Sequence, residues 1–61
     1  MPRVTVEVDE GRTIEQKRGL AKDITDAVTK NCNVKSETVI IVIRETSKEN
    51  RAKGGKLIID S

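Results

Sequence analysis

The sequence predicts an α+β subunit, in which two parallel strands and one amphipathic helix follow the order β-α-β and a short β arm ends the chain. Three patterns predict it. Apolar residues alternate over residues 3–8, recur with helical spacing over residues 13–33, and form an unbroken β-branched run over residues 39–43. The 61 residues allow one domain, 1–61, but bury little surface. We therefore expect oligomerisation to stabilise it.

The first strand is expected at residues 3–8, where Val4, Val6 and Val8 alternate with polar residues. This alternation places the three valines on one face of the strand. Pro2 shares their face by the same rule. Arg3 belongs to the opposite face, where we expect a solvated or interface charge.

A helix is expected to begin at Thr13, because Thr13 and Gln16 have the spacing of a capping box. Its apolar residues recur at the spacing of one helical face, namely Leu20, Ile24, Ala27 and Val28. The helix is expected to close over residues 31–33, because Asn tolerates the left-handed conformation that is common just beyond helix ends.

The second strand is expected at residues 38–43, where residues 39–43 are five consecutive apolar β-branched residues, typical of a strand that is buried on both faces. Strand, helix and strand in succession imply a right-handed parallel unit whose single helix covers one face of the sheet. We expect a second subunit to bury the other face. Gly54 and Gly55 predict a turn into a short C-terminal arm, which we expect to pair with another subunit.

The composition argues against several classes of partner. The net charge is only +2 and there are no aromatic residues, so we expect no nucleic-acid partner. The absence of a long apolar run argues against a membrane partner. Cys32 is the only cysteine, and with no His in the chain it leaves no disulfide and no structural metal site. We interpret Cys32 as a buried structural thiol and expect a reducing, cytoplasmic location.

Pro2 is the most distinctive candidate for chemistry, because His and Tyr are absent. Removal of Met1 would leave a secondary amine at the start of the first strand. An α-amino group titrates near ~8, and an apolar surface beside cations favours its uncharged form. Such a base suits proton abstraction next to a carbonyl. Position alone favours the simpler interpretation, that Pro2 starts a strand where its missing N–H costs nothing.

The chain resembles the 4-oxalocrotonate tautomerase family. The resemblance rests on Pro2 and the alternating strand, on EGRT at residues 10–13 and EQKR at 15–18, and on the second strand with Glu45 and the Gly54–Gly55 pair. It implies a homohexamer, or a smaller homo-oligomer, of β-α-β subunits. It also implies a cofactor-independent keto-enol isomerase that acts on a small acidic 2-hydroxydienoate or enol. Pro2 matches the family's general base, and Arg12 matches the arginine that binds a substrate carboxylate.

Two positions depart from the family pattern. The family's second arginine falls on Ile40, and its aromatic residue before the glycine pair falls on Arg51. Arg51, or Arg44, which lies two residues beyond Val42 on the same strand face, is expected to supply the missing cation from another direction. If neither does, Arg12 alone would anchor a monocarboxylate. The alternative function is a non-catalytic oligomeric scaffold, which a retained Met1 would favour because it makes the Pro2 nitrogen an amide.

Overall fold

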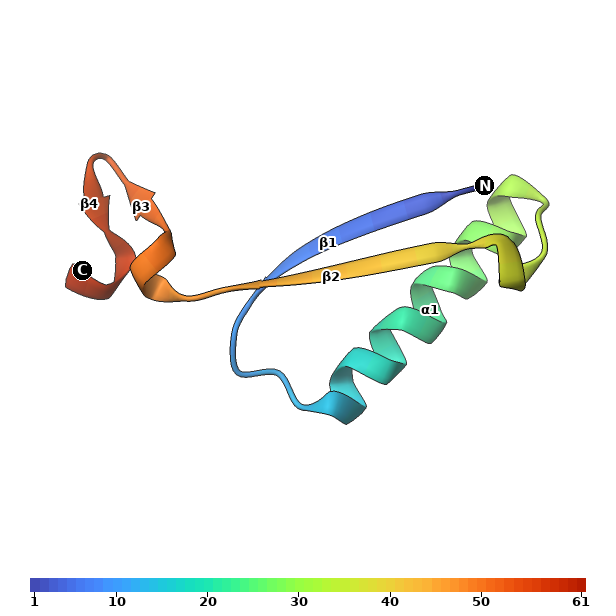
Figure 1. The fold of residues 1–61 in the computed structure, drawn as a ribbon, viewed down its shortest axis with the longest axis horizontal. Coiled ribbons are helices and arrows are strands. Elements are labelled where there is room, and N and C mark those ends of the chain that lie inside the picture. Colours follow the sequence, from blue (N-terminus) through green and yellow to red (C-terminus); the bar gives the residue numbers. More distant parts are fainter.

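The computed structural model of the protein describes residues 1–61 and has the predicted order of elements (Figure 1). The regular elements are β1 (Arg3–Asp9), α1 (Ile14–Cys32), β2 (Ile40–Thr46), β3 (Ala52–Lys53) and β4 (Lys56–Leu57). Single 3-10 turns occupy Ser36–Thr38, Lys48–Asn50 and Ile58–Asp60. The α+β class, the parallel strands, the single helix and the short C-terminal arm are all confirmed. No helix is long and apolar enough to cross a membrane.

The two long strands lie side by side in a parallel register that joins Arg3 to Ile40 and Asp9 to Thr46. The predicted second strand, 38–43, therefore begins too early and ends too early. It begins too early because Ser36–Thr38 form a 3-10 turn before the strand. It ends too early because pairing with β1 continues through polar residues that carry no apolar pattern.

The helix begins and ends as its sequence predicts. Thr13 Oγ1 accepts a hydrogen bond from the backbone N–H of Gln16 at 3.1 Å, and the Gln16 side chain accepts one from the backbone N–H of Thr13 at 2.9 Å. These two bonds complete the capping box. At the other end, Asn33 adopts the left-handed conformation with φ 54°. Cys32 is exposed, so its predicted burial is wrong in the single chain, and Ala27 on the apolar face of the helix is exposed as well. Cys32 is the last helical residue, directly before the chain turns at Asn33.

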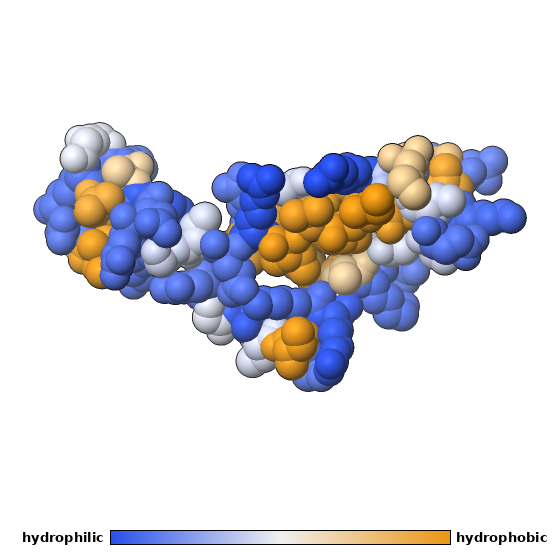
Figure 2. All heavy atoms as spheres, in the orientation of Figure 1, coloured by the Kyte–Doolittle hydropathy of each residue, from blue (hydrophilic) through white to orange (hydrophobic).

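The helix covers one face of the sheet and leaves the other open. Leu20 of α1 lines the same hollow as Val8 of β1 and Ile43 of β2, which places these residues on the covered face. Ile40 and Val42 alternate with Ile43 along β2 and therefore belong to the open face. Ile40 is 40% exposed, and apolar atoms form a band along the paired strands in Figure 2. The expected uncovered apolar face is present.

The single chain has no buried core. No residue is buried, and the accessible surface is 4904 Å². A folded monomer of 6.8 kDa exposes about 3,950 Å² by the usual size relation. The radius of gyration is 14.9 Å, whereas a compact chain of this length has about 10.5 Å. Both differences support the expected self-association.

The C-terminal arm is a small hairpin at the far end of the sheet from the N-terminus (Figure 1). Gly54 and Gly55 have φ 62° and 81°, the two positive values that a type I′ turn requires, so the predicted turn is confirmed. The arm carries exposed apolar side chains at Leu57 (41%) and Ile59 (51%). Its pairing with another subunit stays a prediction.

Candidate active site

A hollow of about 270 Å³ opens between the start of α1 and the C-terminal end of the sheet. Six residues line it, namely Val8, Arg12, Gln16, Lys17, Leu20 and Ile43. The apolar side chains come from both strands and the helix, and the polar ones lie near the start of the helix. The volume lies just below the usual range for a small-molecule site, which suits one part of a larger pocket.

Arg12 is the free cation of this hollow. It lies in the loop between β1 and α1, after Gly11, whose φ of 106° suits glycine, and before the helix cap at Thr13. Its side chain is exposed and takes part in none of the four ion pairs of the chain. A guanidinium next to an apolar wall can bind a carboxylate with two parallel hydrogen bonds.

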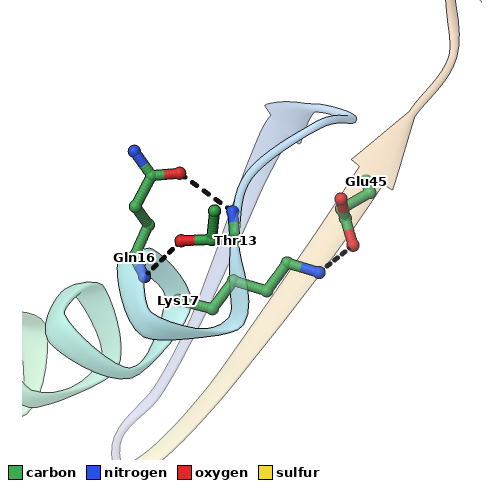
Figure 3. A network of polar contacts seen from close by, with 4 residues as sticks. All are labelled: Thr13, Gln16, Lys17 and Glu45. Atoms are coloured by element: carbon green, nitrogen blue, oxygen red, sulfur yellow. Dashed lines mark hydrogen bonds and ion pairs between the residues drawn. The ribbon is translucent and has the colours of Figure 1, made fainter.

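Lys17 is also cationic, but its charge is compensated. Its ammonium group reaches from α1 across to the carboxylate of Glu45 on β2, as Figure 3 shows. The two side chains are 28% and 34% exposed, so the pair is partly shielded from water. The contact joins the helix to the covered face of the sheet and leaves Lys17 less available to an anionic ligand.

Arg51 is held at the same end of the sheet by Asp9. Its Nη2 lies 3.1 Å from Oδ1 of Asp9, the last residue of β1, and the side chains are 36% and 59% exposed. Arg51 therefore lies at the junction of the sheet and the arm, where its carbonyl also accepts a hydrogen bond from the N–H of Ile58 at 2.9 Å. The Nε atom of Arg51 is buried without a hydrogen-bond partner. The guanidinium thus keeps unused hydrogen-bond donors beside its ion pair with Asp9.

Pro2 lies at the opposite end of β1. Its carbonyl accepts a hydrogen bond from the N–H of Ile40 at 3.0 Å, which fixes the start of the strand beside β2. Six residues of extended chain separate Pro2 from Val8, or about 20 Å. Met1 precedes every regular element, and its side chain is 88% exposed. One chain therefore does not bring Pro2 and Arg12 together.

Arg44 lies on the open face of the sheet, where it is exposed and stands opposite Glu7 in the strand register. Pro2 shares the covered face with Val8, so Arg44 and Pro2 belong to different faces of the sheet. Neither Arg44 nor Arg51 reaches Pro2 within its own chain. Any role for them beside Pro2 requires a second chain.

Sequence reasoning missed the two carboxylates that compensate these cations, Asp9 and Glu45. Each is a polar residue near the end of a strand, and each meets its partner from a distant part of the chain. No local pattern predicts such pairs. The only indication in the sequence was that Asp9 and Glu45 come just after the two expected strands, which end at the same edge of the sheet.

Comparison with known proteins places this site in a family. A family model described as "Tautomerase enzyme" matches residues 2–61. The chain belongs to the tautomerase family. A probable tautomerase of Bradyrhizobium diazoefficiens is 45% identical over 60 residues, covering 98% of this chain and 90% of the relative. The 2-hydroxymuconate tautomerase of Bacillus subtilis is 42% identical over 60 residues, covering 98% and 97%.

Solved structures of tautomerases share the fold. The crystal structure of YwhB, a homologue of 4-oxalocrotonate tautomerase, superposes with a TM-score of 0.91 at 40% identity and 98% coverage of both chains. A heterohexameric 4-oxalocrotonate tautomerase from Chloroflexus aurantiacus superposes with a TM-score of 0.86 at 27% identity, covering 98% of this chain and 97% of that one. The resemblance to the 4-oxalocrotonate tautomerase family is confirmed. As a tautomerase, this protein is an isomerase.

Proposed function

We propose that this tautomerase interconverts the enol and keto forms of a small acidic 2-hydroxydienoate or related enol, with the amine of Pro2 as general base. The observation that carries the proposal is the place of Pro2. Pro2 lies directly before β1, its carbonyl accepts a hydrogen bond from the N–H of Ile40, and Met1 before it lies outside every element. Removal of Met1 would give Pro2 a basic nitrogen without disturbing the strand.

The proposed reaction needs no oxidant or cofactor. The Pro2 nitrogen takes the proton from the enol hydroxyl, the electrons form the carbonyl, and a carbon of the conjugated system becomes nucleophilic. The ammonium form of Pro2 then returns a proton to that carbon, so the base is regenerated. A positioned base of this kind contributes roughly 10²–10⁴-fold to the rate. Arg12 would hold the substrate carboxylate during both transfers.

The proposed site combines residues of two chains, because Pro2 and Arg12 lie at opposite ends of β1 in each chain. The uncovered sheet face and the absent core support a homo-oligomer, and we propose a homohexamer. Arg51 and Arg44 are proposed to line the end of the substrate that is distant from Arg12. In that arrangement the two arginines lie in the site that contains the Pro2 of a neighbouring chain.

The test compares three proteins in an enol-ketonisation assay with 2-hydroxymuconate and the enol of phenylpyruvate. The first is the native chain, whose intact mass reports whether Met1 has been removed. The second is the same chain with a retained N-terminal tag, so that the Pro2 nitrogen is an amide, and the third is Pro2→Ala. We expect activity only when the nitrogen is free, and about 100-fold less activity in Pro2→Ala.

Two results would contradict the proposal. One is a tagged protein that is as active as the protein with a free Pro2. The other is a native protein that retains Met1 and does not accelerate ketonisation of either enol. Both would favour the non-catalytic scaffold.

A further inference from the structure

The charges around the candidate site point to a narrower class of substrate. We infer that the site takes compounds with one carboxylate and an uncharged distal end, and that Asp9 sets this preference by compensating Arg51. The inference rests on the proposed function, because it concerns the ligand of the same site. It makes Asp9 a specificity-determining residue and gives it no part in the proton transfer.

Arg12 is the one unpaired cation among those nearest to the hollow. Two cations line the hollow, Arg12 and Lys17, and Arg51 lies at the junction of the sheet and the arm. Lys17 forms an ion pair with Glu45, and Arg51 forms one with Asp9. Arg12 is the only one of the three that takes part in no ion pair. One uncompensated cation matches one substrate carboxylate.

The geometry of Arg51 explains why a second carboxylate is disfavoured there. Asp9 and Arg12 are three residues apart, so their Cα atoms lie within about 11 Å of each other. A carboxylate at the distal end of a substrate bound to Arg12 would approach Arg51 and meet the negative charge of Asp9, 3.1 Å from the guanidinium. A neutral distal group meets no such repulsion. A neutral oxygen there could still accept a hydrogen bond from an unused N–H of Arg51.

Two stable dienoates provide a matched pair of probes. Muconate carries a carboxylate at each end, whereas sorbate carries a methyl group in place of one of them, and neither has the enol hydroxyl needed for turnover. Calorimetric titration of the assembled protein measures both dissociation constants. We expect sorbate to bind at least as tightly as muconate. In Asp9→Asn, Arg51 loses its compensating charge. We therefore expect the ratio of the two dissociation constants to change about fivefold in favour of muconate.

Three further variants separate a charge effect from a structural one. Asp9→Glu keeps the charge and should keep the native ratio, and Asp23→Asn removes an exposed carboxylate from α1 and should also leave it unchanged. The double variant Asp9→Asn with Arg51→Gln removes both charges and should restore the native ratio. Light scattering on each variant reports the assembly, which we expect to be unchanged.

Each alternative outcome overturns the inference. Muconate binding tenfold tighter than sorbate to the native protein would show two available cations. A ratio that Asp9→Asn leaves unchanged, or an assembly that Asp9→Asn dissociates, would make the ion pair a structural contact only. Binding of neither dienoate would also refute it. The proposed function fails separately, if ketonisation does not depend on a free Pro2, because the two probes bind without reaction.

Discussion

Val42→Asp tests whether the open face of the sheet is buried by another copy of the chain. Val42 lies in the middle of β2 on the face that α1 does not cover, opposite Thr5 of β1. In a single chain the new carboxylate would stand in water at little cost. In an assembly that covers this face it would be removed from water beside Ile40 and Thr5, and only Arg44, two residues along β2, could offset its charge.

The magnitude follows from the surface of the chain. The accessible surface of 4904 Å² exceeds the surface of a compact monomer of this mass by about 950 Å². Covering half of that excess as apolar area supplies about 12 kcal/mol per chain at ~25 cal/mol per Å². Val42→Asp removes about 2 kcal/mol of apolar burial and adds several kcal/mol for a charge that is removed from water, which Arg44 offsets only in part. A loss of at least ~5 kcal/mol per chain weakens association by more than three orders of magnitude.

Sedimentation velocity and circular dichroism measure the outcome over a range of protein concentrations. We expect the native chain to sediment as an oligomer, and Val42→Asp to dissociate and lose most of its helical signal at micromolar concentration. Ala27→Asp is the matched control, because it places the same charge on an exposed position of α1 and should leave the assembly intact. A Val42→Asp protein that keeps the native mass and melting temperature would refute the reasoning, as would a native chain that is a folded monomer.

Three smaller predictions concern single features. Thr13→Ala removes the helix cap and should lower the free energy of unfolding by about 1 kcal/mol per chain in urea titrations, whereas Thr13→Ser should not. Gly55→Ala places a side chain at φ 81° and should cost about 1–2 kcal/mol by the same measurement, and a cost near zero would show that the arm turn contributes nothing to stability. Arg12→Lys keeps the charge but loses the planar fork, so KM for acidic enols should rise about tenfold with a smaller change in kcat. An unchanged KM would exclude Arg12 as the carboxylate anchor.

The elements were predictable wherever a local pattern determines them. Thr13 and Gln16 mark the start of the helix because a capping box needs only those two side chains, and Gly54–Gly55 mark the hairpin because few other residues adopt positive φ at both positions. The end of β2 was not predictable from its own residues. Arg44 and Glu45 belong to the strand only because β1 continues beside them.

The candidate site was likewise predictable from the sequence only in part. Pro2 and Arg12 are identified by sequence, through the family resemblance and their chemistry. Their separation along β1 follows from the predicted strand, because six extended residues span about 20 Å. The hollow that Arg12 shares with Val8 and Ile43 required the structure. The compensation of Arg51 by Asp9 also required the structure, since the two residues are far apart in sequence and each alone is an ordinary exposed charge.

The measurement that tests the central claim most directly is a subunit-mixing experiment. Pro2→Ala and Arg12→Gln chains are unfolded together in equal amounts, refolded, and assayed for enol ketonisation beside each variant refolded alone. If each site takes Pro2 from one chain and Arg12 from another, about a quarter of the sites in a random mixture contain both native residues, and the mixture should regain about a quarter of the native activity. A mixture that remains as inactive as its two parents would contradict a site shared between chains.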